Sequence, residues 1–232
     1  MRLDKFLCDC RLGTRSQVKK DIKAGLVTVN DVKVLKPEQH IDEHTDCIHY
    51  KGQQCVYEEF VYYMLHKPSG LVSATEDKHE QTVIDLFSQE GRDDLFPVGR
   101  LDKDAEGLLL ITNDGALAHA LLSPAKHVEK EYECHLAKSF DNIQKSQLEQ
   151  GVDIGEKAMT KPAVVHILDE KRITLTIIEG KFHQVKRMLY AVGNEVVYLK
   201  RLRMGTLTLD QELPKGSYRR LTEEETENLR KC

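Results

Sequence analysis

The sequence predicts an α+β protein in two parts: a small N-terminal part of helices and short strands, and a larger part built on a mixed, mainly antiparallel sheet with flanking helices. Two observations predict this organisation. In the larger part strand-like segments predominate, and helix-like segments stand singly between them without regular β-α-β alternation. A polar stretch without periodicity, 53–60, separates the two parts. We therefore expect domains at 1–52 and 61–232, joined by a linker at 53–60.

The composition indicates a folded chain that needs no disulfide or metal. A chain of 232 residues can bury a sizeable core by itself. The six cysteines lack the paired two-residue spacing of zinc sites, so we expect reduced thiols and no metal, with Cys8, Cys10 and Cys47 the only plausible cluster.

Charged residues interrupt the apolar positions at the start of the chain, and no later apolar run approaches the roughly 20 residues of a membrane span. We expect a cytoplasmic protein without a membrane segment.

Two short helices are predicted at the start of the N-terminal part. Leu3, Phe6 and Leu7 recur at the spacing of an amphipathic helix. Thr14 and its capping box with the glutamine three residues later predict the start of a second helix, and Gly25 lies where that helix is expected to end. Two short strands, 26–29 and 32–34, follow, and the Asn-Asp pair between them forms a turn. This unit is expected to end near residue 52.

The larger part is predicted to begin with a strand at 61–65. That strand is expected to stop at 66–70, His-Lys-Pro-Ser-Gly, because a strand does not continue through this turn sequence. Further apolar or alternating stretches predict strands at 108–112, 130–137, 163–168, 173–178 and 195–202. Helical stretches, each followed by Pro or Gly, predict helices at 116–122, 141–150 and 183–192.

The net charge of −4 is unevenly distributed along the chain. Basic residues outnumber acidic ones in 1–25 and 181–203, whereas an acidic run occupies 223–227. Basic side chains that neutralise phosphates supply most nonspecific nucleic-acid affinity. The two basic segments are therefore candidate RNA-binding surfaces, and ordinary solvated helix faces are the alternative interpretation.

The stretch 99–115 contains the strongest candidate for chemistry. It presents Asp102 in a glycine-bounded loop just before a buried apolar run, next to the cationic Arg100. This setting suits a catalytic acid, a nucleophile or a salt bridge.

Two other kinds of site use nearby carboxylates. Asp104 and Glu106 could join Asp102 as the carboxylate pair of a glycosidase. Asp102, Asp104 and Asp114 could hold magnesium for nuclease chemistry. Neither hypothesis explains the basic N-terminal part or the motifs further along the chain.

The box Gly-Arg-Leu-Asp at 99–102, followed by the run Gly-Leu-Leu-Leu-Ile-Thr-Asn-Asp-Gly at 107–115, closely resembles the catalytic motif of the pseudouridine synthases, in their small-subunit branch. Three further boxes match this family in its order: Lys-Pro-x-Gly at 67–70, Lys-x-Tyr at 130–132 and His-Gln-Val-Lys-Arg-Met at 183–188. The resemblance spans nearly the whole chain and implies conversion of uridine in RNA to pseudouridine without a cofactor.

The N-terminal part resembles the S4-type (αL) RNA-binding module. The residues that carry this resemblance are Arg2-Leu3-Asp4, Ser16, Gly25 and the Val-Thr-Val-Asn stretch at 27–30. Such a module binds RNA and catalyses nothing by itself. The resemblance implies RNA contacts from the basic and polar side chains of its helices: Arg2, Lys5, Arg15, Ser16, Lys19 and Lys20.

The resemblance also implies roles for three residues of the larger part. Asp102 becomes the essential aspartate, and its step remains open among attack on the base, attack on the sugar and removal of a sugar proton to give a glycal. Lys186 is its expected cationic partner, with Arg187 the alternate, because neighbouring helical residues face different directions. Lysine lacks the bidentate fork of arginine. Tyr132 is expected to stack on the extruded base and to assist proton removal.

Further residues are expected to contact RNA or to support the loop. Arg100 contacts phosphate or sugar when the base is flipped out, or it forms a salt bridge beneath the loop. His183 and Gln184 contact RNA or simply start the helix, and Arg187 also counts among the expected RNA contacts. The box at 67–70 is interpreted as structural.

The expected partner is 16S rRNA, as a single uridine in a ribonucleoprotein assembly intermediate, because the box at 183–188 is more similar to small-subunit than to large-subunit enzymes. We expect the protein to act as a monomer. The alternative hypothesis is a noncatalytic RNA-binding ribosome-assembly factor on the same scaffold.

Overall fold

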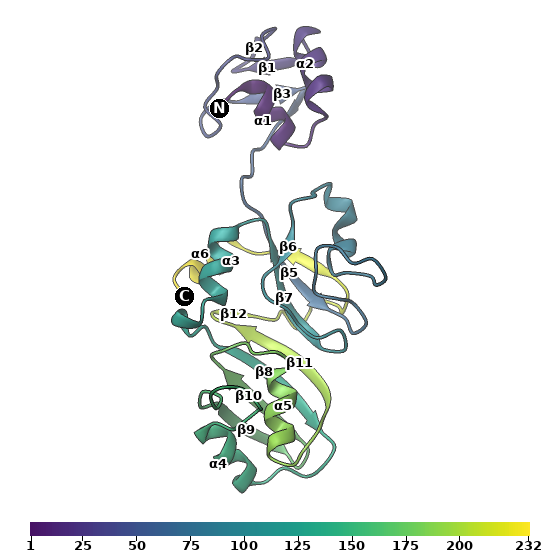
Figure 1. The fold of residues 1–232 in the computed structure, drawn as a ribbon. Coiled ribbons are helices and arrows are strands. Elements are labelled where there is room, and N and C mark those ends of the chain that lie inside the picture. The colour runs from purple at the N-terminus through teal and green to yellow at the C-terminus, as the bar shows by residue number, and fades with distance from the viewer. The chain divides into compact units, whose positions relative to one another are not determined.

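The computed structural model describes residues 1–232, which form two compact units, Met1–Phe60 and Val61–Cys232 (Figure 1). Each unit has its own buried apolar core. None of the helices combines the length and the apolar character that a membrane-spanning helix needs. The six cysteines are free thiols.

The N-terminal unit packs two helices against a small antiparallel sheet. The helices are α1 (Leu3–Asp9) and α2 (Arg15–Lys23). The hydroxyl of Thr14 accepts a hydrogen bond from the backbone N–H of Gln17, so the predicted cap of α2 is present. The strands lie in the order β2-β1-β3-β4, with the bounds β1 (Val27–Val29), β2 (Val32–Lys33), β3 (Ile48–Tyr50) and β4 (Gln53–Gln54).

The boundary of this unit differs from the sequence-based expectation. Strand β4 pairs with β3, so the first two residues of the expected linker 53–60 belong to the sheet. The compact unit continues to Phe60. Gln53 and Gln54 are exposed and polar, so no alternation of apolar residues marks them as a strand. Their backbone pairing with β3 decides their conformation.

The C-terminal unit is built on a nine-stranded sheet in which the strand path is β13-β5-β7-β11-β8-β10-β9. Strand β12 pairs with β11, and β6 pairs with β7. The pairing of β7 with β11 is parallel, and the other pairs are antiparallel. The predicted mixed, mainly antiparallel α+β fold is therefore confirmed. The strand bounds are β5 (Tyr62–Lys67), β6 (Phe96–Pro97), β7 (Glu106–Thr112), β8 (Lys130–Leu136), β9 (Val164–Asp169), β10 (Arg172–Ile177), β11 (Val196–Met204), β12 (Leu207–Thr208) and β13 (Tyr218–Arg220).

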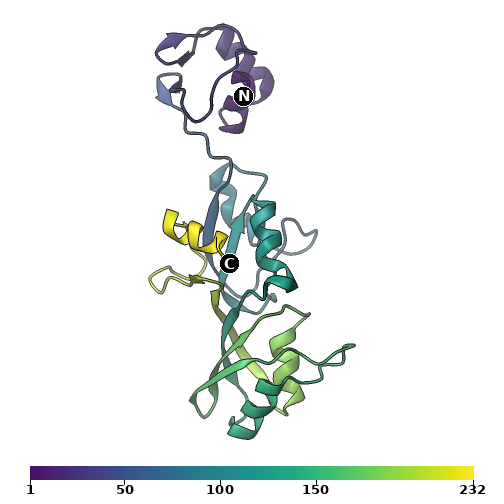
Figure 2. The ribbon, with the colours of Figure 1, turned by 90° about the vertical axis from the view of Figure 1, so that its left-hand side faces the viewer.

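Helices cover both faces of this sheet. One core cluster includes α4 (Asn142–Gln150) and α5 (Gln184–Ala191), which lie beside the same end of the sheet in both views (Figures 1 and 2). The other cluster includes α3 (Gly115–Leu122) and α6 (Glu223–Arg230). Strand β7 is buried along its whole length, and its residues 108–111 enter the two clusters alternately. Two 3-10 helices complete the unit, η1 (Ile84–Glu90) and η2 (Pro124–Lys126).

One prediction for this unit was wrong. Strand β5 continues through His66 and Lys67, which pair with Leu108 and Gly107, although these two residues were expected to begin a turn. The buried contacts of the Lys67 ammonium, described below, allow the strand to extend this far.

The acidic run near the C-terminus forms the unpredicted helix α6. Thr222 and Glu225 make a reciprocal capping box at its start. Carboxylates in the first turn of a helix interact favourably with its dipole, so this clustered charge stabilises a helix end.

Candidate active site

Asp102 lies in the loop that enters β7, and this loop is tied to the segment after β5. The hydroxyl of Ser73 donates to the carbonyl of Leu101 at 2.9 Å and accepts from the Leu101 N–H at 3.1 Å. The backbone N–H of Gly70 donates to the carbonyl of Lys103 at 2.7 Å. These bonds fix the backbone on both sides of Asp102.

Lys67 adds a buried cation beneath the same loop. Its side chain is fully buried. Its Nζ atom lies 3.2 Å from the carbonyl oxygens of both Asp102 and Lys103, 2.8 Å from that of Ala105 and 3.0 Å from that of Pro68. An ammonium has three hydrogens and no acceptor, so a cage of carbonyl oxygens suits it. Lys67 therefore holds three backbone positions of the Asp102 loop.

The protonation of Lys67 is sensitive to this environment. Burial lowers the pKa of Lys67 to about 8, and the carboxylates of Asp104, Glu106 and Asp102 oppose that decrease. The ammonium that holds the loop can therefore lose its proton in mildly alkaline solution.

Lys186, on α5, bridges two carboxylates of the loop. Its Nζ atom lies 3.0 Å from Oδ2 of Asp102 and 2.6 Å from Oδ1 of Asp104. Partial burial lowers the pKa of Lys186, but its bonds to Asp104 and Asp102 outweigh this effect and raise the pKa above its ordinary value. The hydrogen bond from Lys186 in turn lowers the pKa of Asp104. The structure thus brings Lys186 to Asp102, as the sequence analysis expected, and adds Asp104 as a second partner.

His183 also approaches Asp102. Its Nε2 atom lies 3.5 Å from Oδ1 of Asp102, whereas Lys186 faces the other carboxylate oxygen, Oδ2. His183 precedes the first residue of α5 and has a left-handed backbone conformation, with φ of 47°. Asp102 is thus flanked by an ammonium and an imidazole.

Arg187 and Gln184 face the protein instead of Asp102. Arg187 donates to Oε1 of Glu156 at 2.9 Å, to the carbonyl of Phe182 at 3.0 Å and to the carbonyl of Ile154. The alternate pairing of Arg187 with Asp102 is therefore wrong.

The amide of Gln184 is engaged inside the protein. It accepts from the N–H of Lys181 at 2.8 Å and donates to Oε1 of Glu179 at 2.7 Å, and the side chain is buried. Of its two expected roles, starting the helix matches this geometry, and an RNA contact does not.

Tyr132 and Arg100 occupy different settings. Tyr132, on β8, is 7% exposed and belongs to the core cluster that also contains Leu101 and Ala105, on either side of Asp102. It lies opposite Arg201 of β11. Arg100 is exposed, which suits a contact with RNA better than a salt bridge beneath the loop.

The carboxylates of the two alternative sites are engaged separately. Glu106 accepts from the hydroxyl of Tyr198 at 2.9 Å and pairs with Lys215 at 2.7 Å. Asp114 caps α3 through the N–H of Leu117 at 3.0 Å. No three side chains of the types that bind metals gather in the structure. The geometry favours neither the glycosidase nor the magnesium nuclease.

Lys67, Ser73 and Asp104 are the residues of this site that sequence reasoning missed or undervalued. Lys67 was interpreted only as part of a turn-shaping box, and Asp104 only as a member of alternative sites. A charged residue at the end of an apolar strand was the available signal for Lys67. Nothing in the spacing of Ser73 indicated its contact with Leu101.

In the N-terminal unit, expected RNA-binding cations surround a buried carboxylate. Arg2 donates to both oxygens of Asp4, at 3.0 and 2.8 Å, and Arg15 and Lys19 each lie 3.9 Å from Oδ2. Burial raises the pKa of Asp4, but the bonds from Arg2 and the charges of Arg15 and Lys19 outweigh this effect and lower it. Asp4 is fully buried, whereas the three cations reach solvent. The other expected contacts on these helices are exposed: Lys5, Ser16 and Lys20.

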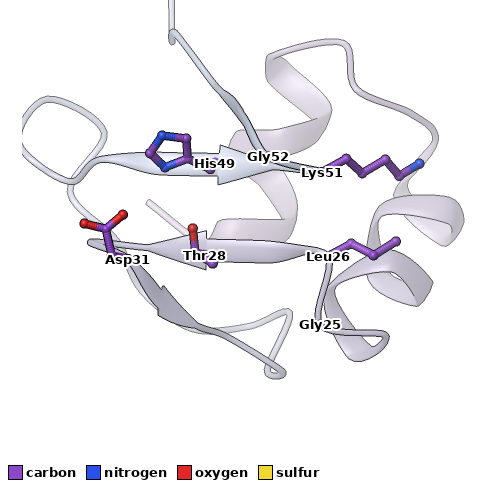
Figure 3. Close-up of a pocket in the computed structure, with 7 residues that line it drawn as sticks. All are labelled: Gly25, Leu26, Thr28, Asp31, His49, Lys51 and Gly52. Carbon is purple, nitrogen blue, oxygen red and sulfur yellow. The ribbon is translucent and has the colours of Figure 1, made fainter.

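A separate cavity of about 490 Å³ lies on the strands of this unit. Figure 3 shows Thr28 and His49 side by side on β1 and β3, with the helices behind the strands. The residues that line the cavity are Gly25, Leu26, Thr28, Asp31, His49, Lys51 and Gly52. It is thus distinct from the cations around Asp4, which belong to the helical side.

Two family models match this chain. The RNA pseudouridylate synthase model matches residues 61–191, and the S4 domain model matches residues 1–47. The first covers the Asp102 loop and Lys186, and the second covers the cations around Asp4.

Individual proteins are similar over nearly the full length. The "Uncharacterized RNA pseudouridine synthase YtzG" of Bacillus subtilis is 51% identical, over 97% of this chain and 96% of its own. The "Ribosomal small subunit pseudouridine synthase A" of Vibrio cholerae is 43% identical, over 99% of both chains, and that of Haemophilus influenzae is 40% identical, also over 99% of both. A crystal structure of a pseudouridylate synthase superposes with a TM-score of 0.71 at 39% identity, covering 99% of both chains.

Proposed function

Since the chain belongs to the RNA pseudouridylate synthase family, we propose that it converts a single uridine of 16S rRNA into pseudouridine, with Asp102 as the essential group and without a cofactor. Its membership makes it an RNA pseudouridine synthase, an isomerase that modifies RNA. The small ribosomal subunit in the names of its relatives supports 16S rRNA as the substrate.

The reaction requires few groups from the protein. The bond between the ribose and N1 of uracil breaks, the base turns while it stays bound, and the ribose is joined to carbon 5. The proton at carbon 5 then leaves for solvent and N1 takes up a proton, so the product is an isomer of the substrate. No electrons are gained or lost and no group is imported, so a carboxylate, a site for the detached base and a proton acceptor suffice.

The setting of Asp102 is the observation that carries this proposal. The ammonium of Lys186 lies 3.0 Å from the carboxylate, and an adjacent cation favours the ionised form of a carboxyl group. Lys67 holds the backbone carbonyl of the same residue at 3.2 Å. A charged carboxylate on a fixed loop is prepared to act on a base that is delivered to it. Its step remains one of three: attack on the base, attack on the sugar, or removal of a sugar proton.

Other residues serve the extruded nucleotide. Tyr132, in the core cluster beside the loop, stacks on the uracil and assists removal of the proton from carbon 5. Arg100, exposed two positions before Asp102, contacts the backbone that extrusion distorts. His183, 3.5 Å from Asp102, contacts the same nucleotide.

The N-terminal unit supplies a second RNA contact. Arg2, Arg15 and Lys19 bind phosphates, because their three positive charges exceed the single negative charge of Asp4. With two RNA contacts on one chain, a monomer can act on rRNA within a ribonucleoprotein assembly intermediate in the cytoplasm.

Tritium release tests the reaction. The protein and its Asp102→Asn variant are incubated with small-subunit rRNA labelled with tritium at uracil carbon 5, with and without ribosomal proteins, and the tritium in water is counted. We expect release by the unchanged protein and none by the variant. Asp104→Asn is the matched control, because Asp104 shares the loop and the Lys186 contact, and it should still release tritium.

The result also decides among the substrates. Release from 16S rRNA only when ribosomal proteins are present would support the assembly intermediate. If no RNA released tritium although the protein still bound RNA, the proposed reaction would be wrong and the hypothesis of a noncatalytic assembly factor would be favoured.

A further inference from the structure

Phe182 presents an aromatic ring to solvent beside the Asp102 site. Its side chain is 72% exposed. The ring stacks on that of His183, with centroids 3.8 Å apart and planes tilted by 20°. The Nε2 atom of His183 is 3.5 Å from Asp102. The two rings form a continuous surface that leads from solvent to the carboxylate.

The backbone that carries these rings is held from within the protein. Arg187 donates to the carbonyl of Phe182 at 3.0 Å. Gln184 bonds to both Lys181 and Glu179 on the same turn. The left-handed φ of His183 is uncommon outside glycine and persists where the surroundings determine it. The exposed ring therefore stands on a fixed turn.

A single exposed hydrophobic side chain on a protein surface is normal and needs no explanation. Phe182 is distinguished by its stacking on His183 and by the charges around it. Lys186 lies on the same segment and contacts Asp102, and Arg100 is exposed two positions before Asp102, so the segments that form this site carry two cations. Cations bind phosphates, and aromatic rings stack on bases, so the combination fits nucleic acid.

We propose that Phe182 and His183 form a stacking platform for an unpaired RNA base that neighbours the uridine delivered to Asp102. This inference rests on the proposed function. The occupant is a base in a loop or single strand, because both faces of a base inside a duplex are already covered. When the target uridine moves out of the RNA stack toward Asp102, the neighbouring base loses its stacking contact with that uridine. The platform supplies an aromatic contact in its place.

The stack is measured directly with the full-length protein and a short single-stranded oligouridine that contains one 2-aminopurine, whose fluorescence falls on stacking. Phe182→Ala should abolish the quenching and weaken binding about tenfold, within the range for loss of one base–aromatic stack. Phe182→Tyr should restore both. Ile143→Ala is the matched control, because Ile143 is 71% exposed but lies on α4.

Tritium release from small-subunit rRNA is measured in parallel. For Phe182→Ala we expect KM to rise about tenfold with little change in kcat, because the stack stabilises substrate and transition state alike. Unchanged quenching and affinity in Phe182→Ala would overturn the platform. So would a loss confined to RNA that carries ribosomal proteins, which would identify Phe182 as a protein contact.

The two proposals fail in different ways. If the unchanged protein releases no tritium, the proposed function fails, whatever the quenching. If it releases tritium and Phe182→Ala still quenches normally, only the platform fails.

Discussion

The Nζ atom of Lys186 lies 3.0 Å from Oδ2 of Asp102, and the same atom lies 2.6 Å from Oδ1 of Asp104. One ammonium thus serves two carboxylates that are two positions apart on a loop. Asp104 is largely exposed, whereas Asp102 is mostly buried. The shorter contact is with Asp104, whereas water screens the contact with Asp102 less because that carboxylate is less exposed.

Replacing Lys186 tests this pairing. Lys186→Met should lower kcat by about a hundredfold or more, as removal of one charge-stabilising group in an active site does. Lys186→Arg keeps the charge and should retain most of the rate. Steady-state tritium release gives both values. Lys181→Met is the control: Lys181 has a similar exposure, 22% against 27%, but pairs with Glu179. A kcat of Lys186→Met within twofold of the unchanged protein would contradict the pairing.

Removing the Lys67 ammonium should destabilise the C-terminal unit. Lys67→Met leaves the carbonyls of Asp102, Lys103 and Ala105 without their buried donor. Each unsatisfied buried group costs about 1–3 kcal/mol. We expect a fall of about 3 kcal/mol in the free energy of unfolding, measured by urea denaturation. Lys103→Met, which breaks only the exposed pair with Glu80, should cost under about 1 kcal/mol.

The pH dependence of activity should report Lys67. Its pKa is lowered by burial to about 8, so above pH 8 the neutral amine donates fewer hydrogen bonds to the Asp102 loop. We expect kcat to decline with a midpoint near pH 8. The residual activity of Lys67→Met should lack this decline. If kcat of the variant still declined near pH 8, the titration would belong to another group.

The contribution of Lys67 to the free energy of unfolding should rise above pH 8, whereas kcat is expected to fall. The pKa of Lys67 is about 8 in the folded protein, against 10.5 ordinarily. Between these values the unfolded chain binds more protons, so raising the pH favours the folded state through this group. We expect the unfolding free energy of the unchanged protein, relative to that of Lys67→Met, to increase from pH 8 to about 10.5. A decrease would show that the pKa is raised instead.

Gly107 should resist substitution. Its φ is 102°, and an added Cβ would clash with the carbonyl oxygen of Arg201 and lie 2.7 Å from the Arg201 nitrogen. These two residues are partners in the parallel pair of β7 with β11. Gly107→Ala should therefore destabilise the unit by about 3 kcal/mol or more, since overpacking and a forbidden φ add.

Gly115 provides the control for this substitution in thermal unfolding. It begins α3 and has no atom within 4 Å of an added Cβ. Gly115→Ala should be neutral or stabilising by up to about 1 kcal/mol. Equal stability of the two alanine variants would contradict the close approach of β7 and β11.

The cations around Asp4 should determine the salt dependence of RNA binding. Arg15→Ala or Lys19→Ala should each weaken binding of small-subunit rRNA and reduce the slope of log K against log salt by about 0.7–0.9. Lys33→Ala is the control, since Lys33 is exposed on strand β2. Filter binding at several salt concentrations gives the slopes, and equal slopes for the three variants would exclude a phosphate contact at Arg15 or Lys19.

Local patterns predicted most of the regular elements. The capped helix α2, the buried strand β7 and the helix α5 lie within a few residues of their expected bounds, because caps and apolar spacing act over a single turn or strand. Strands β3, β4, β6, β12 and β13 were missed. They are short, and their pairing with distant segments decides them.

The sequence by itself determined the family, the α+β class and the candidate pair of Asp102 and Lys186, because motifs preserve chemistry and order along the chain. Only the tertiary structure decided which cation faces the aspartate, since Lys186 and Arg187 are neighbours and the orientation of α5 separates them. It also decided that Lys67 belongs beneath the Asp102 loop. A buried ammonium needs several acceptors at once, and the fold gathers those carbonyls from residues far from Lys67 in the sequence.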